Sequence, residues 1–334
     1  MERLLKSRYK IKEKIGENPF SVTYKGAFLE KDGPILIKIY KRSVLSSSLI
    51  KSVKRKVKNL CAITHPNIAK VVDGDYGWQG FYFVREFVKG KSLADILKET
   101  PKLEIDHALD IALQITEGLL SAHEKGIIHG ALNLNNVFIV EGGIVKLTDF
   151  IIEGDIRGAI KERAQTVYSS SFLTPEEVRG EVVTARSDIY CVGLLLYAML
   201  TGLNPFQGAS GLETSLKTVQ GAFESPRKLR ADIPEYVEDI IFRCLEGDPL
   251  MRFATVKDIL ASLKAKSLIE DVLIKEAVPD ISLGGLIDSA SDGSSSKTAT
   301  EEREGPNIRL VLLIVLLGAV LGIGWAAFSV LYNR

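Results

Sequence analysis

The chain has 334 residues, of which 46% are hydrophobic and 25% are charged, a composition that argues for a folded protein and against a disordered one. Its formal net charge is +1, so no overall field marks it as a nucleic-acid-binding protein. Cys61, Cys191 and Cys244 lie far apart without metal-ligand spacing, which favours free thiols in the core over disulfides or a zinc site.

The N-terminus carries charged residues and lacks the apolar stretch of a secretory signal, so we expect the first domain to stay in the cytosol. Within about residues 1–268, short β-type runs include Phe81–Val84 and Ile144–Leu147. Longer helical patterns occur at Asp106–Glu124 and Ser187–Leu200. Strands dominate the early part and helices the later part, which predicts an α+β architecture.

Two features near the start of the chain suggest a phosphate-binding site. The segment Ile15–Tyr24 lies between apolar runs, where a phosphate-covering loop would be expected, and Gly16 is its only glycine. Lys38 follows the β-type run Ile35–Ile37. If it is buried, its ammonium group needs an anionic partner such as phosphate oxygens, whereas an exposed strand lysine needs none. The sequence leaves both alternatives open.

A basic helix is predicted next, at Ser48–Leu60. Its cationic residues are Lys51, Lys54, Arg55, Lys56 and Lys58. They could contact anionic lipid headgroups or an acidic partner, or they could form an ordinary solvated helix face.

Four short motifs then follow in order, and the series is more specific than any one of them. They are His65–Ile68, Ile127–Val137, Lys146–Phe150 and Thr174–Glu176.

The C-terminal part has a different composition. Residues 269–308 include a run rich in serine, glycine and acidic residues that cannot bury enough apolar surface to fold, which predicts a flexible linker. Leu310–Tyr332 is a run of 23 uncharged residues, and about 20 apolar residues suffice to cross a bilayer. A buried core helix is the alternative, but one so apolar after a polar linker would be unusual. We assign 309–332 to a single-pass transmembrane helix that anchors a cytoplasmic domain.

The ordered motifs make the chain resemble the eukaryotic-type protein kinase family over roughly residues 9–265. The resemblance implies a bilobal fold, with a β-rich N-lobe at about 1–88 and an α-rich C-lobe at about 89–268. It also implies a set of fold-supporting residues: His129, Glu176, Asp188 and Arg252.

The same resemblance implies where nucleotide and metal would bind. The nucleotide-binding positions are Gly16, Lys38, Glu86 and Val88. Asn136 and Asp149 match the two residues that hold magnesium. Arg85 directly precedes Glu86–Val88, the expected hinge between the lobes, and stands where the family usually has an apolar side chain. It would either reach a phosphate or carboxylate group or turn to solvent.

Several catalytic positions depart from the family pattern. Ala131 stands where the family has the aspartate that accepts the substrate's proton, so the catalytic base is absent. Asn133 replaces the lysine that stabilises charge on the transferring phosphoryl group. Lys56 falls where a helix glutamate should pair with Lys38, and two ammonium groups repel each other.

Because these losses compound, we interpret the chain as a pseudokinase that acts as a signalling scaffold or regulator. Binding of ATP and Mg²⁺ stays open and is expected to be weak or absent. The alternative is a divergent serine/threonine kinase that uses Lys38, Asn136 and Asp149 for slow transfer.

We expect a protein partner, which the sequence does not identify. We do not expect a nucleic-acid partner. Gly318 and Gly322 form a GxxxG pair through which two transmembrane helices could form a homodimer.

Overall fold

The computed structural model describes residues 3–18, 21–30, 33–42, 47–77, 80–150 and 172–265. The chain divides into two units, 1–278 and 279–334, and every described residue belongs to the first. No helix within the described ranges is long and apolar enough to cross a membrane. The predicted linker and transmembrane helix lie outside these ranges and stay predictions.

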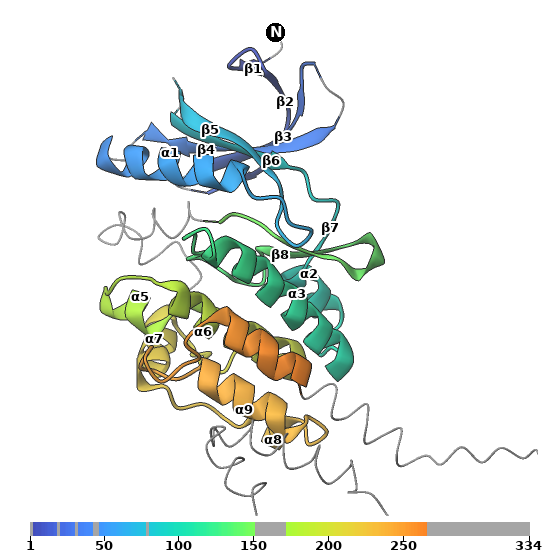
Figure 1. Ribbon diagram of the computed structural model, residues 1–334, viewed down its shortest axis with the longest axis vertical. Coiled ribbons are helices and arrows are strands. Elements are labelled where there is room, and N and C mark those ends of the chain that lie inside the picture. The colour runs from blue at the N-terminus through green and yellow to red at the C-terminus, as the bar shows by residue number, and fades with distance from the viewer. Residues whose placement is uncertain are drawn as a thin grey trace, which may run out of the picture. The chain divides into compact units, whose positions relative to one another are not determined.

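The N-lobe is built on a six-stranded antiparallel sheet with the strand order β1-β2-β3-β4-β6-β5 (Figure 1). Its strands are β1 (Arg3–Leu5), β2 (Tyr9–Glu17), β3 (Ser21–Phe28), β4 (Pro34–Lys41), β5 (Val71–Gly77) and β6 (Gly80–Glu86). Strand β4 lies between β3 and β6. It is rich in isoleucine and almost wholly buried, as expected for a β-branched run in a central strand.

Helix α1 (Ser47–Cys61) packs against strand β5. Its apolar residues Val53, Val57 and Leu60 recur at helical spacing, and all three are buried in the main core. Alternate residues of β4 and β6, such as Ile37 and Tyr82, belong to a second, smaller core. The two-residue period of a strand therefore divides these strands between two packed layers.

A second, three-stranded sheet connects the lobes. Its strands are β7 (Gly90–Ser92), β8 (Val137–Val140) and β9 (Val145–Leu147), and the turn η2 (Glu141–Gly143) joins the last two. Asn67 fixes this sheet to the N-lobe, because its carbonyl accepts from the Leu147 amide at 2.8 Å and its side chain donates to the Val145 carbonyl at 3.0 Å. The predicted motif His65–Ile68 is thus a structural link between the lobes.

The rest of the C-lobe is helical. Its helices are α2 (Leu93–Glu99), α3 (Ile105–His123), α5 (Pro175–Arg179), α6 (Ala185–Thr201), α7 (Gly211–Gln220), α8 (Pro226–Leu229), α9 (Glu235–Cys244) and one at 256–265. Helix α6 contacts both α3 and α9, and it is buried on nearly every side (Figure 1). It begins at a capping box formed by Thr184 and Ser187 and ends at Gly202, whose φ of 75° suits glycine.

The predicted bilobal α+β fold is confirmed. The helical patterns at Asp106–Glu124 and Ser187–Leu200 correspond to α3 and α6, and Phe81–Val84 lies within β6. All three cysteines are free thiols; Cys191 and Cys244 are buried, whereas Cys61 is half-buried rather than a full core residue.

Candidate active site

Lys38 lies on the face of β4 that is turned away from the smaller core. Its side chain is only 8% exposed, and its Nζ is 3.6 Å from Oδ2 of Asp149. The buried alternative is therefore correct, and the anionic partner within the described residues is a carboxylate. Helix α1, from which the family pattern would supply a glutamate, contains no acidic residue, and Lys56 on it is half-buried.

Arg85 shares this face of the sheet. It pairs with Leu36 across β4 and β6, and Lys38 lies two residues beyond Leu36, so both cationic side chains project to the same side. The Arg85 side chain is 5% exposed, and its Nε donates to Oδ1 of Asp149 at 3.3 Å. Its Nη1 donates to the carbonyl of Glu86 at 3.1 Å. The solvent-facing interpretation of Arg85 is therefore wrong, and the side chain reaches a carboxylate.

Asp149 lies two residues after the end of strand β9, and its carboxylate contacts both Lys38 and Arg85. Its φ is 59°, a left-handed conformation that aspartate tolerates better than most residues. Burial by itself would raise the pKa of its carboxyl group, but the charges of Lys38 and Arg85 outweigh burial and hold that pKa below its usual range. The carboxylate is therefore ionised at neutral pH and compensated by two cations.

The hinge residues have partners of their own. The Glu86 carboxylate is 3.0 Å from Nζ of Lys146 and accepts from the backbone amide of Lys70 at 3.1 Å. Val88 is buried between β6 and β7. The side chain of Glu86 is thus committed to local structure, and its carbonyl is already in contact with Arg85.

The loop between β2 and β3 is closed by its own residues. The Asn18 amide donates to the Ser21 carbonyl at 2.9 Å, and the Ser21 amide donates to Oδ1 of Asn18 at 2.7 Å. A Cβ atom added to Gly16 would meet its nearest neighbour only at 4.0 Å, so the backbone there does not require glycine. Because the Ser21 amide is used internally, it is not available to hold a phosphate in this arrangement.

The catalytic loop is held together through the carbonyl of Ala131. That oxygen accepts from Nδ2 of Asn133 and from Nδ2 of Asn136, each at 2.9 Å. Asn133 also accepts from the Asn135 amide at 2.8 Å. At the base position, the Ala131 side chain is a buried methyl group. The Asn133 side chain bonds back to the loop, whereas the lysine of the family pattern would supply a positive charge there.

Asp188, in the first turn of α6, holds the catalytic loop through hydrogen bonds. Its carboxylate accepts from the backbone amides of His129 and Gly130, each at 2.8 Å, and lies 2.7 Å from Nε2 of His123. Gly130 has a φ of 69°, which explains a glycine there in conformational terms. His129 is fully buried and packs against the ring of Phe150 at 4.4 Å.

Glu176 and Arg252 form the other support. Glu176 lies in α5, and Arg252 lies just before the helix at 256–265. Each residue is 2% exposed. The Ser187 hydroxyl donates to the Glu176 carboxylate at 2.6 Å. The Arg252 guanidinium also lies 4.7 Å from the Tyr190 ring centroid. The four residues predicted to support the fold thus occupy two buried polar networks.

Asn136 and Asp149 are the residues that would hold magnesium. Mg²⁺ takes oxygen ligands in near-octahedral geometry and keeps several waters. Both oxygens of the Asp149 carboxylate face a cationic side chain. Asn136 donates through Nδ2 to the Ala131 carbonyl, a bond that does not use Oδ1, the atom that would bind a metal. An ion at Asp149 would have to displace Arg85 or Lys38. As arranged, the Asp149 carboxylate does not fit a bound magnesium ion.

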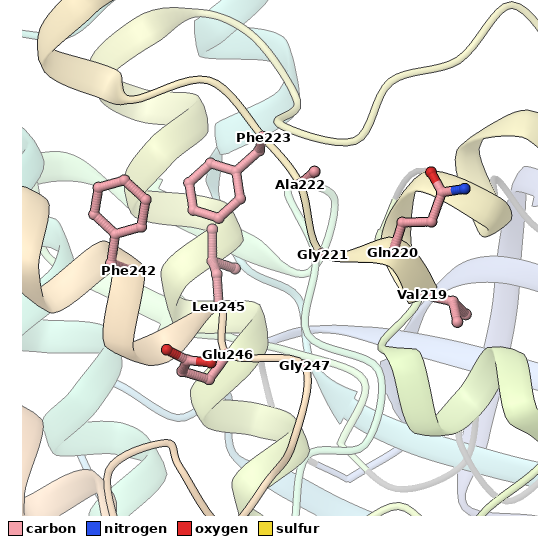
Figure 2. A pocket seen from close by; sticks show the side chains of 9 residues that line it. All are labelled: Val219, Gln220, Gly221, Ala222, Phe223, Phe242, Leu245, Glu246 and Gly247. Carbon is pink, nitrogen blue, oxygen red and sulfur yellow. The ribbon is translucent and has the colours of Figure 1, made fainter.

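Two surface features lie apart from this site. On α1, Lys54 pairs with Asp75 of β5, whereas Lys51, Arg55 and Lys58 are exposed. A pocket of about 300 Å³ lies at the ends of α7 and α9, where the rings of Phe223 and Phe242 are 5.1 Å apart (Figure 2). It contains none of the predicted site residues.

The family model for the protein kinase domain matches residues 9–263, which include both lobes and every element described above except β1 and the last two residues of the helix at 256–265. The chain belongs to the protein kinase family. A solved protein of this fold, Rad53 in complex with AMP-PNP, matches with a TM-score of 0.63 and 25% sequence identity, covering 75% of this chain and 63% of that one.

Two bacterial relatives of this chain are informative. A probable serine/threonine-protein kinase of Clostridium perfringens is 30% identical over 264 residues, covering 78% of this chain and 38% of the relative. Serine/threonine-protein kinase PrkC of Bacillus subtilis is 28% identical over 313 residues, covering 90% of this chain and 48% of the relative. The aligned parts thus span less than half of either relative.

Within this kinase fold, the structure brings Lys38 and Asp149 into contact and adds Arg85 to them. It does not bring an acidic residue of α1 to Lys38. Sequence reasoning missed the Asn18–Ser21 closure and the inward turn of Asn133. A signal existed for the second, because asparagine side chains commonly bond backbone groups two residues away.

Proposed function

We propose that this protein kinase family member is a pseudokinase, which binds ATP weakly and serves as a signalling scaffold or regulator without transferring phosphate. The observation that carries the proposal is the catalytic loop. The side chain at the base position is the Ala131 methyl group, and Asn133 is bonded to the Ala131 carbonyl. A methyl group cannot accept the proton of a substrate hydroxyl, and an inward amide supplies no positive charge for the transition state.

Support for ATP binding comes from two sources. The Rad53 structure, which has the same fold, holds AMP-PNP. In this chain, the buried Lys38 and Arg85 provide cationic groups that could contact phosphates. Weak affinity is expected because the Ser21 amide is bonded within its own loop and α1 contains no acidic residue to position Lys38.

The second candidate is an active serine/threonine kinase, and a specific observation favours it. The curated relatives are named as serine/threonine-protein kinases, and Lys38, Asn136 and Asp149 are retained. General-base help is worth roughly 10² to 10⁴ in rate, so the loss of one aspartate slows transfer without forbidding it.

We also propose that the kinase-like domain is cytoplasmic and anchored by residues 309–332 in a membrane. The support is the uncharged run Leu310–Tyr332. A homodimer through Gly318 and Gly322 is the proposed assembly. The proposed signalling partner is a protein whose identity the sequence does not specify.

The deciding experiment measures phosphate transfer by the purified full-length chain, to itself and to a generic protein substrate. We expect incorporation no higher than that of the Asp149→Ala variant, while ATP raises the melting temperature of the wild-type chain. An active kinase assayed in parallel verifies the conditions. Transfer that Asp149→Ala abolishes would replace the pseudokinase proposal with the active-kinase one.

A further inference from the structure

We propose that Arg85 takes the place of the divalent cation at Asp149, so that this site binds a nucleoside triphosphate without magnesium. The proposal rests on the ATP binding proposed above and concerns how that binding is achieved. Its starting point is the disagreement between the metal expected at Asp149 and the guanidinium that lies there.

The guanidinium is held at two points. Nε of Arg85 donates to Oδ1 of Asp149 at 3.3 Å, and Nη1 donates to the Glu86 carbonyl at 3.1 Å. The residue is 4% exposed, so leaving this position would require its charge to cross packed protein or become buried without these partners. Arg85 is therefore a fixed positive charge of the site rather than a mobile surface residue.

Chemically, arginine can do part of what a metal does here. Its planar fork of N–H groups matches phosphate oxygens, and the N–H groups that are not used on Asp149 and Glu86 can bind them. Arginine keeps its charge at any physiological pH. It thus neutralises Asp149 and has further N–H groups with which to contact phosphate.

The local charges favour a metal-free ligand. Lys38 and Arg85 both face the carboxylate of Asp149. A magnesium ion bound at this carboxylate would bring a third cation to the same group. A free triphosphate brings phosphate oxygens to the two cationic side chains without adding that cation. A magnesium ion beside the Arg85 guanidinium would add like-charge repulsion.

The test compares ATP affinity of the full-length chain in excess EDTA and in excess MgCl₂, by calorimetry. For the wild type we expect the two dissociation constants to agree within about threefold. For Arg85→Met, which supplies an apolar side chain at this position, we expect binding at least about tenfold tighter in MgCl₂ than in EDTA. Arg55→Met, which removes an exposed arginine from α1, is the matched control and should behave as wild type.

A second variant keeps the test independent of how Arg85→Met folds. Asp149→Asn removes the carboxylate that a metal would need. At a metal-dependent site it would weaken ATP binding in MgCl₂ by about tenfold or more. Here, affinity in EDTA should be kept or increased, because Lys38 and Arg85 lose their competing anion.

Several results would overturn the proposal. One is wild-type binding that is about tenfold tighter in MgCl₂ than in EDTA. Another is an Arg85→Met variant that folds and remains indifferent to magnesium. Binding in MgCl₂ but not in EDTA would refute this inference alone. Absence of binding in both media would refute the proposed ATP binding as well, and phosphate transfer would refute the pseudokinase proposal by a separate readout.

Discussion

Arg252 donates two parallel hydrogen bonds to Glu176, from Nη1 to Oε1 at 2.8 Å and from Nη2 to Oε2 at 2.9 Å. The two residues are 76 positions apart in the chain and both are buried. This bidentate geometry joins α5 to the segment before the last described helix, and Ser187 connects the pair to α6. The ion pair therefore fixes the three segments relative to one another.

Replacing Arg252 by alanine should lower the free energy of unfolding by about 3 to 5 kcal/mol, because the buried Glu176 carboxylate would lose its compensating charge. Urea denaturation of the full-length chain measures this. Lys264→Ala breaks an exposed pair with Glu117 and should cost at most about 1 kcal/mol. If the two substitutions lowered the free energy of unfolding equally, the buried pair of Glu176 and Arg252 would contribute no more to stability than an exposed pair.

Gly193→Ala should destabilise the chain through the contact between α6 and α9. A Cβ atom at this position would lie 2.6 Å from Cβ of Cys244. Overpacking costs about 1 to 3 kcal/mol, and the better helix propensity of alanine returns at most about 1 kcal/mol. Thermal unfolding gives the net loss. The matched control is Gly247→Ala, which meets nothing within 4 Å and should change stability by less than about 0.5 kcal/mol.

Asp75 should make a pH-dependent contribution to stability. Burial by itself would raise the pKa of its carboxyl group, but bonds from Lys54 and Lys6 lower that pKa from 3.8 to about 2. Because the folded-state pKa is the lower one, the stabilisation is present above the unfolded pKa and is lost as the pH falls through the folded one.

We therefore expect Asp75→Asn to cost about 1 kcal/mol at pH 7, a value limited by solvent screening of its exposed lysine partners. The difference from wild type should shrink as the pH falls from 3.8 toward 2. Urea denaturation at a series of pH values follows it. A difference that stays constant or grows on acidification would contradict the assigned pairing.

Restoring the catalytic aspartate alone should not restore catalysis. In Ala131→Asp, the returned base could contribute roughly 10² to 10⁴ in rate, but Asn133 would still supply no cation and α1 would still contain no acidic residue to position Lys38. Transfer of labelled phosphate should stay at the level of Ala131→Asn, a variant of similar size without the charge. A rise of tenfold or more that Asp149→Ala removes would mean that the rest of the site is competent.

Deleting residues 309–332 should release the protein from the membrane fraction, because the chain would lose its long uncharged run. Centrifugation after carbonate extraction measures the partition. Replacing Gly318 and Gly322 by isoleucine is the companion experiment, which should leave anchoring intact and disrupt only the proposed dimer. A deletion variant that still sediments with membranes would point to α1 or another surface as the anchor.

The sequence predicted the scaffold well because the scaffold depends on motifs whose order is fixed along the chain. Glu176, Asp188 and Arg252 were placed by such motifs, and each has the buried role expected of it. That α1 contains no acidic residue to pair with Lys38 can be read directly from its amino-acid composition.

The contacts inside the site could not be derived in the same way. Arg85 and Asp149 are 64 residues apart, and their meeting depends on the register of β4 with β6 and on the path of the chain after β9. The sequence left two directions open for Arg85, and packing decides between them. Likewise, the Asn18–Ser21 closure depends on loop geometry, which residue types alone do not specify.

The buried guanidinium of Arg85 also determines what kind of chemical probe would suit this protein. An inhibitor that extends an apolar group beyond the hinge would press against a charged group and separate it from its carboxylate, at a substantial desolvation cost. A compound with a small anionic substituent at that point would instead gain a charge-assisted hydrogen bond. Ligand discovery for the site around Arg85 should therefore begin from acids rather than from the lipophilic scaffolds that fit an apolar side chain at this position.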